Sequence, residues 1–345
     1  MNIIAPVELL KRQYLQLIVP EELTLPRKQF LKLPDTQAQI YNGMFDESRT
    51  TFVPPERYTF RVLKRLMKAL EDAIEDPEED EISDDISGYL AQYMGQPLPS
   101  ASTAAQQKIY VTYTAPNLCP DASQVTLLEA PSLLASSGTT GFRTWEAALF
   151  LGAYLSSPEG RHFVIGKSVL ELGAGTGFLS IFCAKHLGAQ RVLATDGSQE
   201  VISDLRSNIH LNELEGNESI QTAVLQWGHA LIGGVADGRE GKQPYDLVLG
   251  ADVTYDLKSI PSLVATLRDL FELSRVKILI SATVRNEQTL GAFTIACGKN
   301  GFTLKQLDVP MPEKEHQIGF FVPTATPIKI YLITKEGPMK DPFAL

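Results

Sequence analysis

The stretch VLELGAGTG, residues Val169–Gly177, determines how the rest of the chain is interpreted. Its first half, apolar except for Glu171, passes directly into three glycines at alternate positions, and the residues that follow, FLSIFCAKHL, are typical of a buried helix. Glycine lets a backbone turn tightly and lets a ligand approach it closely. The free N–H groups at the start of a helix favour an electronegative ligand group. The stretch therefore predicts a buried strand, a ligand-binding turn and a helix.

From this point towards the C-terminus, strand patterns alternate with helix patterns. Strands are expected at residues 168–173, 191–196, 219–227, 245–253 and 276–284, and helices at 178–187, 198–212, 259–273 and 287–300. Such alternation predicts a mostly parallel sheet with helices on both faces. Two further strand patterns, at residues 301–309 and 328–334, have no helix between them and predict an antiparallel pair.

The first hundred residues have a different character. Apolar residues recur at helical spacing in residues 8–18 and 56–74, which predicts a helical extension. The acidic run EDAIEDPEEDEISDD, residues 71–85, predicts a solvated loop and helix end, with a surface for a basic partner as the alternative.

A linker and a hairpin are expected to follow the helical part. Residues 95–107, GQPLPSASTAAQQ, are small and polar and predict a linker. KIYVTYT and QVTLLEA then predict a β-hairpin. We therefore expect an N-terminal helical extension over residues 1–105 and a second domain over residues 106–345.

Composition narrows the function classes. The chain has 345 residues and a formal net charge of −10, which argues against a broad surface for nucleic acid. Its three cysteines, Cys119, Cys183 and Cys297, form no CxxC pair, and its five histidines form no HxxxH or HExxH pattern, so no disulfide framework and no metal site is expected. The N-terminus lacks the pattern of a signal peptide, and no run approaches the ~20 apolar residues of a membrane span. We expect a soluble, cytoplasmic monomer.

The ligand of the glycine turn follows from its flanking residues. The dinucleotide fingerprint needs glycine or alanine where this chain has Phe178, and no GK[ST] follows as in a Walker loop. Asp196 ends the next strand, where an acidic residue can accept hydrogen bonds from a ribose diol. A carboxylate inside a buried strand, as at Glu171, costs free energy unless it is paired. These features favour S-adenosylmethionine, which carries a sulfonium, an amino group and a ribose diol but no phosphate.

The combination VLELGAGTG, ATD and YDLVLGADVTYD resembles the class I, seven-strand S-adenosylmethionine-dependent methyltransferases over about residues 138–334. It is similar in particular to the branch that methylates lysines of non-histone proteins. GFRTWEAALFL matches the helix before the glycine strand, QWG matches an aromatic residue beside adenine, and GADVTYD matches the [DE]-x-x-[YF] signature. The resemblance implies an α/β fold: a Rossmann-like seven-stranded sheet with helices on both faces, plus the helical extension and the hairpin.

The same resemblance implies roles for ten residues. Those expected to bind S-adenosylmethionine are Trp145, Glu171, Gly173, Ala174, Gly175, Asp196, Trp227 and Ala251. Asp252 and Tyr255 are expected to face the acceptor nitrogen. The helical extension followed by SSGTTGFRTWEAALFL resembles one subgroup, the lysine methyltransferases of eukaryotic elongation factor 2, which implies that protein as the partner and substrate recognition as the task of the extension.

Taken singly, each of these residues also fits an ordinary structural role. Trp145 and Trp227 suit a core, Tyr255 suits loop packing, and Asp196 and Asp252 suit turns or helix caps. Alternatives for the whole chain are a small-molecule or RNA methyltransferase, an inactive adaptor with this fold, and a dehydrogenase. The segment after the fourth strand lacks an Asn-Pro-Pro-[FY] sequence, which makes adenine or glutamine less favoured as acceptors.

Overall fold

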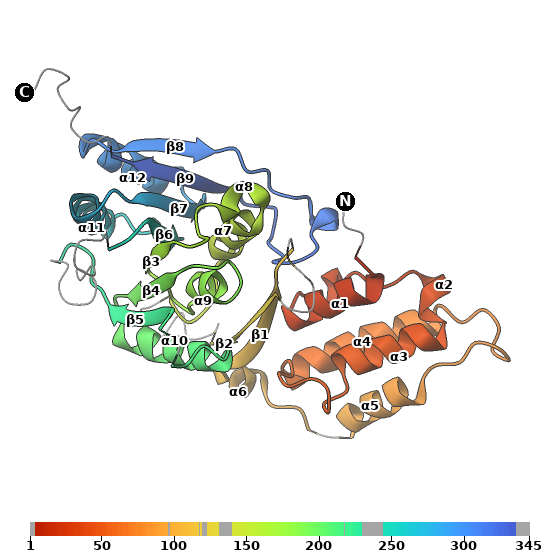
Figure 1. The fold of residues 1–345 in the computed structure, drawn as a ribbon. Coiled ribbons are helices and arrows are strands. Elements are labelled where there is room, and N and C mark those ends of the chain that lie inside the picture. The colour runs from red at the N-terminus through yellow and green to blue at the C-terminus, as the bar shows by residue number, and fades with distance from the viewer. Residues whose placement is uncertain are drawn as a thin grey trace, which may run out of the picture. The chain divides into compact units, whose positions relative to one another are not determined.

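The computed structural model describes residues 4–95, 97–116, 118, 123–130, 140–216, 218–229 and 244–335, which form two compact units (Figure 1). The first unit takes its described residues from Met1–Pro116, Pro120–Gly138 and Gln317–Phe321, and the second takes the rest. Cys119 and the Ser-Ser-Gly stretch at residues 136–138 lie outside the described residues. Among the described helices none is long and apolar enough to cross a membrane.

The second unit is built on one sheet of seven strands. The strands are β3 (Ser168–Leu172), β4 (Arg191–Asp196), β5 (Ile220–Val224), β6 (Leu247–Ala251), β7 (Lys277–Thr283), β8 (Thr303–Leu307) and β9 (Ile328–Thr334). Their order is β5-β4-β3-β6-β7-β9-β8; the first five are parallel, and β9 runs antiparallel to both of its neighbours. The predicted α/β sheet and its antiparallel pair are confirmed, and the last strand inserts between β7 and β8.

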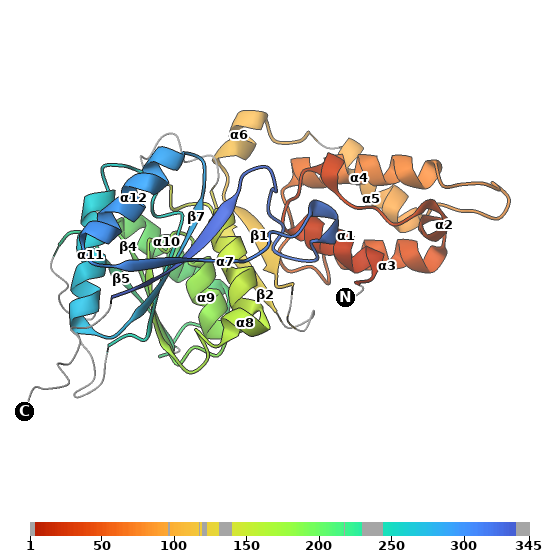
Figure 2. The same ribbon diagram turned by 90° about the horizontal axis from the view of Figure 1, so that it is seen from above.

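Helices cover both faces of this sheet (Figure 2). They are α7 (Glu146–Ser156), α8 (Pro158–Arg161), α9 (Phe178–Lys185), α10 (Gln199–Leu211), α11 (Ile260–Leu273) and α12 (Glu287–Lys299). Apolar residues of α11 and α12 form one continuous core with β3, β6 and β7. On the other face α7 packs against α9, and α9 packs against β4. The central strand β3 is buried along its whole length, as expected for a parallel strand covered on both sides.

The first unit is mainly helical. Its helices are α1 (Pro6–Leu15), η1 (Pro20–Glu22), α2 (Lys28–Leu31), α3 (Pro34–Met44), α4 (Glu56–Glu71), α5 (Asp84–Met94) and α6 (Ala101–Gln106). Leu10, Tyr14, Leu63 and Leu66 are fully or almost fully buried in their common core. The acidic run is a solvated loop between α4 and α5, as expected. The predicted linker was wrong in part, because it contains α6, whose first turn is capped by the Ser100 hydroxyl accepting from the Thr103 N–H at 3.1 Å.

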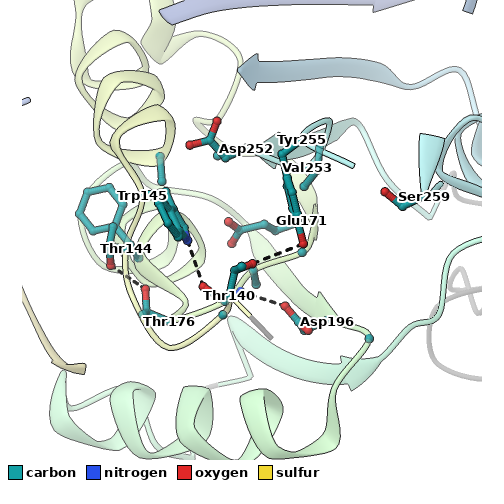
Figure 3. Close-up of a pocket in the computed structure, with 18 of the residues that line it drawn as sticks. Thr140, Thr144, Trp145, Glu171, Thr176, Asp196, Asp252, Val253, Tyr255 and Ser259 are labelled. Atoms are coloured by element: carbon teal, nitrogen blue, oxygen red, sulfur yellow. Dashed lines mark hydrogen bonds between the residues drawn. The ribbon is translucent and has the colours of Figure 1, made fainter. Parts of the chain in front are cut away.

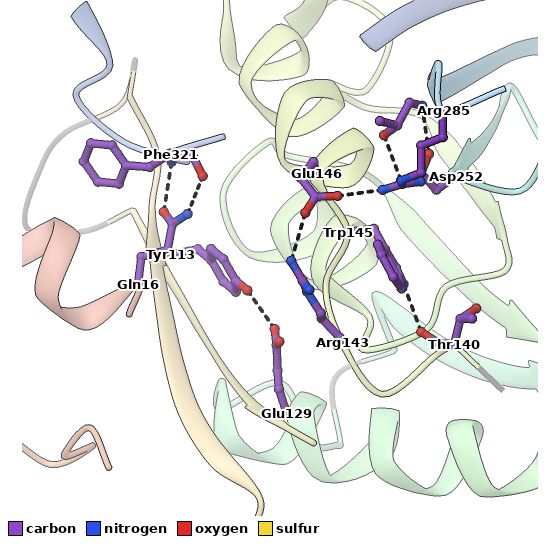
Figure 4. Close-up of polar contacts among 11 residues, drawn as sticks. Gln16, Tyr113, Glu129, Thr140, Arg143, Trp145, Glu146, Asp252, Arg285 and Phe321 are labelled. Carbon is purple, nitrogen blue, oxygen red and sulfur yellow. Dashed lines mark hydrogen bonds and ion pairs between the residues drawn. The ribbon is translucent and has the colours of Figure 1, made fainter. Parts of the chain in front are cut away.

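The hairpin of β1 (Ile109–Thr114) and β2 (Gln124–Glu129) belongs to this first unit, so the domain boundary expected after residue 105 falls inside it. So does a short segment of the β8–β9 connection, Gln317–Phe321, which we call the strap. The Gln16 side chain binds both backbone groups of Phe321, donating to its carbonyl at 2.6 Å and accepting from its N–H at 3.0 Å (Figure 4). The Arg12 guanidinium donates to the Ile318 carbonyl at 2.8 Å.

Candidate active site

A cavity of about 390 Å³ opens where the parallel strands end, and it is the size of an ordinary small-molecule site (Figure 3). All ten residues singled out from the sequence line it: Trp145, Glu171, Gly173, Ala174, Gly175, Asp196, Trp227, Ala251, Asp252 and Tyr255. They come from the carboxyl ends of β3, β4 and β6 and from the segments that follow β5 and precede α7. The structure thus brings together residues that span more than a hundred positions of sequence.

The glycine turn has the conformation that only glycine adopts easily. Gly173, Gly175 and Gly177 all have positive φ, at 66°, 53° and 85°. A Cβ on Gly173 would lie 3.0 Å from Val253 and 3.4 Å from Trp227. The Gly175 N–H donates to an Asp196 carboxylate oxygen at 3.2 Å, which ties the turn to the end of β4. The turn therefore presents bare backbone to the cavity.

Glu171 is a buried carboxyl group at the base of the cavity, with only 3% of its surface exposed. One carboxyl oxygen accepts hydrogen bonds from the backbone N–H and the hydroxyl of Ser180, in the first turn of α9. Burial is the main cause that raises the pKa of Glu171 to about 8, and the Ser180 hydrogen bonds oppose this only in part. The carboxyl is held in place, and a cationic ligand would favour its ionised form.

Asp196 provides the second carboxyl group of the cavity. Its side chain accepts from the backbone N–H groups of Gly175, at 3.2 Å, and Ser198, at 3.1 Å. Burial raises its pKa, against the effect of these hydrogen bonds. A carboxylate whose orientation is fixed by backbone donors on both sides is well placed to accept from a diol.

Two tryptophans supply aromatic walls. Trp145 caps the start of α7, and its indole N–H donates to the Thr140 carbonyl at 3.0 Å. Trp227 follows β5 and packs against Gly173 and the core under α11. Each ring is only partly buried, which fits a wall better than a core position.

Asp252 and Tyr255 lie at the outer end of the cavity. Asp252 has a positive φ of 50°, and its carboxylate accepts from the Thr283 N–H at 2.8 Å and from the Thr283 hydroxyl at 3.0 Å. Only 9% of this residue is exposed. Tyr255 is 59% exposed, and its hydroxyl accepts from that of Thr140 at 3.4 Å. A buried acid and an exposed ring thus line the same cavity.

Three charged residues around Trp145 were missed from the sequence. Glu146 accepts from Arg143 at 2.8 Å with one carboxylate oxygen and from Arg285 at 2.8 Å with the other (Figure 4). Both guanidinium groups face the Trp145 ring, at 5.1 Å and 5.0 Å from its centroid. Arg143 and Glu146 are three positions apart in GFRTWE, a spacing that indicates an ion pair. No short sequence pattern connects Arg285, 139 positions after Glu146, with this site.

These residues fit S-adenosylmethionine. The bare backbone of the glycine turn leaves room for a ligand, and the two interior carboxyl groups, Glu171 and Asp196, suit an amino group and a ribose diol. The only basic side chain that lines the cavity within the described residues, Arg143, is paired with Glu146, so a pyrophosphate has no free cationic partner there. In the same part of the chain, no group of three His, Cys, Asp or Glu side chains is placed to hold a metal ion.

The sheet, the glycine turn and the carboxyl-lined cavity define the chain as a methyltransferase that uses S-adenosylmethionine. A family model described as lysine methyltransferase matches residues 134–295. The chain is 44% identical over 321 residues to the protein-lysine N-methyltransferase EFM3 of Chaetomium thermophilum, covering 92% of this chain and 94% of that protein. It belongs to this family of protein-lysine methyltransferases.

Two further relatives have the same activity in their names. EFM3 of Saccharomyces cerevisiae is 34% identical over 233 residues, which cover 62% of this chain and 66% of that protein. The human protein-lysine N-methyltransferase EEF2KMT is 32% identical over 197 residues, which cover 53% of this chain and 57% of that protein.

Proposed function

We propose that this enzyme transfers a methyl group from S-adenosylmethionine to a lysine of translation elongation factor 2, in the cytoplasm. The observation that carries the proposal is the cavity itself, where a buried carboxylate, Asp252, and an exposed aromatic ring, Tyr255, stand at the entrance to a pocket suited to this cofactor. The name of the human relative EEF2KMT refers to elongation factor 2 and supports the choice of substrate.

We assign the inner part of the cavity to the cofactor. Glu171 would attract its amino group, Asp196 would accept from its ribose hydroxyls, and the backbone of Gly173, Ala174 and Gly175 would allow close approach. Trp145 would frame the methionine end, Trp227 would flank the adenine, and Ala251 would lie beneath the reacting centre. When bound, S-adenosylmethionine supplies a methyl group that is already activated on a sulfonium.

The protein's remaining task is to align the acceptor and exclude water. A lysine amine has an ordinary pKa of about 10.4 and attacks only after it loses a proton. Asp252 would orient the amine, and the ring of Tyr255 would form a wall along the aliphatic part of the lysine side chain. Removal of the amine from water favours its neutral form.

We assign recognition of the protein substrate to the first unit. Its α4 carries four exposed basic residues spaced four, three and four positions apart, Arg57, Arg61, Lys64 and Lys68, which place them on one face of the helix. This basic face stands out in a chain whose formal net charge is −10, and it suits an acidic surface on the substrate.

The test uses the purified chain, labelled S-adenosylmethionine and cytosolic extract from cells that lack the endogenous enzyme. One labelled band of the size of elongation factor 2, with the label on lysine, is expected. Label on RNA or on metabolites alone would overturn the proposal in favour of a small-molecule or RNA methyltransferase. Absence of cofactor binding in calorimetry would favour an inactive adaptor.

Two variants separate the acceptor side from the cofactor side. Asp252→Ala should abolish transfer and largely spare cofactor affinity, whereas Asp196→Ala should weaken cofactor binding by about ten- to a hundredfold, the range for a lost hydrogen bond to a charged group. Asp256→Ala is the matched control, because its carboxylate lies in the same loop as Asp252 and caps only the backbone N–H of Lys258.

A further inference from the structure

A chain of alternating charges lies at the outer end of the cavity (Figure 4). Arg143, Glu146, Arg285 and Asp252 are joined in that order, with 2.8 Å for each of the first two contacts. Both terminal nitrogens of Arg285 then lie 3.4 Å from the same oxygen of Asp252. Two positive and two negative side chains are linked, so the formal charge of this group of four residues is zero.

We propose that Arg285 compensates the charge of Asp252, so that Asp252 orients the acceptor lysine without holding it as an ammonium ion. This inference rests on the proposed function, since it takes Asp252 as the group that meets the lysine amine. Arg285 acts here as a positioning and charge-compensating residue and does not itself contact the reacting atoms.

The physical reason is that a carboxylate near a lysine has two opposed effects. It can accept a hydrogen bond and so direct the amine. An uncompensated carboxylate within about 4–6 Å also favours the charged form and shifts the pKa of a neighbouring group by about 1–3 units. The ammonium form has no free electron pair and cannot attack. A guanidinium next to the carboxylate leaves the hydrogen bond to the amine in place and reduces the rise in the pKa of the amine.

The compensation requires that neither partner moves away. Asp252 is fixed by two hydrogen bonds from Thr283 and is almost fully buried. Arg285 is 44% exposed in its side chain and would otherwise extend into solvent. Glu146 prevents this, because its carboxylate holds the guanidinium at 2.8 Å and the Trp145 ring lies against it. Glu146, the residue that follows Trp145 in sequence, thus holds Arg285 in place.

The other ionisable groups around the acceptor side are of three kinds. In the interior of the cavity are the carboxyl groups of Glu171 and Asp196. At the rim, Tyr255 is exposed. On the surrounding loops and at the start of α12, Lys258 and Glu287 are exposed, and Asp256 is partly exposed. Among the described residues Arg285 is therefore the cation that directly contacts Asp252.

The experiment compares wild-type enzyme with Arg285→Met and Arg285→Lys on purified elongation factor 2, with kcat and KM measured from pH 6.5 to 9.5. In Arg285→Met the acid limb of the kcat profile should move up by about one pH unit, which gives about a tenfold lower kcat near neutral pH and convergence with wild type at high pH. KM should stay the same or fall, because the ammonium form binds better to an uncompensated carboxylate. Arg285→Lys should retain the wild-type limb.

A binding measurement gives a second readout without turnover. Affinity for elongation factor 2 in the presence of S-adenosylhomocysteine should be equal or higher in Arg285→Met at pH 7. Arg285→Gln, which also lacks the charge, repeats both measurements if the methionine variant is unstable, and Arg268→Met, on the exposed surface of α11, is the matched control.

The outcomes distinguish this inference from the proposed function. If wild-type enzyme methylates elongation factor 2 and both uncharged variants lose kcat equally at every pH, Arg285 has only a structural role and the inference is wrong. If wild-type enzyme places no label on any lysine, the proposed function fails first and the inference fails with it. A shifted acid limb in both uncharged variants, but not in Arg285→Lys, supports it.

Discussion

At the level of single residues, Glu171 is a buried carboxyl group of the sheet that also lines the cavity. It lies in β3, the middle one of the five parallel strands, a position normally taken by an apolar residue. Its burial raises its pKa to about 8, so the carboxyl group is mostly protonated at neutral pH in the free protein. A cationic cofactor beside it favours the carboxylate. With the cofactor placed as proposed, its binding is coupled to release of this proton.

This coupling predicts that the binding of S-adenosylmethionine at pH 7 releases close to one proton. Calorimetric titrations in buffers of different ionisation enthalpy should give binding enthalpies that vary with the buffer, with a slope near one. Glu171→Gln should bind the cofactor more weakly and show a slope near zero. A slope that is equal in both proteins would show that the proton comes from another group.

The same residue predicts a pH dependence of stability in the free protein. The unfolded chain loses the Glu171 proton near its ordinary pKa of 4.5, whereas the folded chain keeps it to about 8. The stabilisation from this group is therefore fully present below pH 4.5 and is lost as the pH rises to about 8. Denaturant unfolding of Glu171→Gln should lack this part of the decline, and parallel curves for the two proteins between pH 5 and 8 would contradict the prediction.

At the level of elements, two side chains join the end of α1 to the strap, Arg12 at Ile318 and Gln16 at Phe321. Gln16 satisfies both backbone groups of Phe321, and all of these atoms are buried. Gln16→Ala leaves an N–H and a carbonyl without partners, at about 1–3 kcal/mol for each buried group. We expect the first unit to lose about 2–6 kcal/mol of unfolding free energy.

Hydrogen exchange measured by mass spectrometry tests this expectation. The amide of Phe321 should exchange much faster in Gln16→Ala, together with amides of the hairpin. Gln39→Ala, at an exposed position of α3, is the control with the same change of side chain. Unchanged protection of the strap in Gln16→Ala would mean that the Arg12 hydrogen bond and apolar contacts are enough to hold it.

The elements themselves were largely predictable, and the physical reason differs between them. The inner parallel strands β3 and β4 are largely buried, so they stand out as apolar runs, and both match the expected ranges within a residue. Helix α6 was missed because its residues, ASTAAQ, have no apolar period and depend on the cap from Ser100. The insertion of β9 between β7 and β8 has no local signal.

The site was predictable where a short stretch of sequence contains its residues, and it was not predictable where strand pairing brings distant residues together. Gly173, Ala174 and Gly175 of the glycine turn were found from a short motif, whereas Thr176 and Phe178 also line the cavity and were not singled out. Thr283 and Arg285 were not, because they lie 31 and 33 positions beyond Asp252. They meet Asp252 through the parallel register of β6 and β7, in which Ala251 pairs with Ser281. A pairing of strands, which no short motif encodes, completes the acceptor side.

At the level of the whole molecule, the proposal that the first unit recognises the protein substrate can be tested by changing charges. The basic face of α4 should attract an acidic surface on the protein substrate. Lys64→Glu combined with Lys68→Glu should raise KM for elongation factor 2 by about three- to tenfold. The reversal of each exposed charge is expected to cost roughly 0.5 kcal/mol of binding free energy. Cofactor affinity should not change, and the effect should shrink in high salt.

The control for this double variant carries the same change of charge on the second unit. Lys299→Glu combined with Lys305→Glu alters two exposed positions on α12 and β8. If both pairs raise KM equally, net charge and not the face of α4 is responsible. Surface variants are preferable to deletion of residues 1–105, because α1 packs on β1 and its side chains hold the strap.

The strap has a consequence for how the protein is made. Ribosomes deliver a chain from its N-terminus, and domains generally fold as they emerge. Here residues 317–321, which follow almost the entire catalytic sheet, supply backbone that Arg12 and Gln16 must bind. Arg12 and Gln16 of the N-terminal helices therefore lack these backbone partners until residues 317–321 have left the ribosome. A premature stop codon shortly before residue 317 would therefore destabilise the N-terminal helices as well as the C-terminal part of the protein.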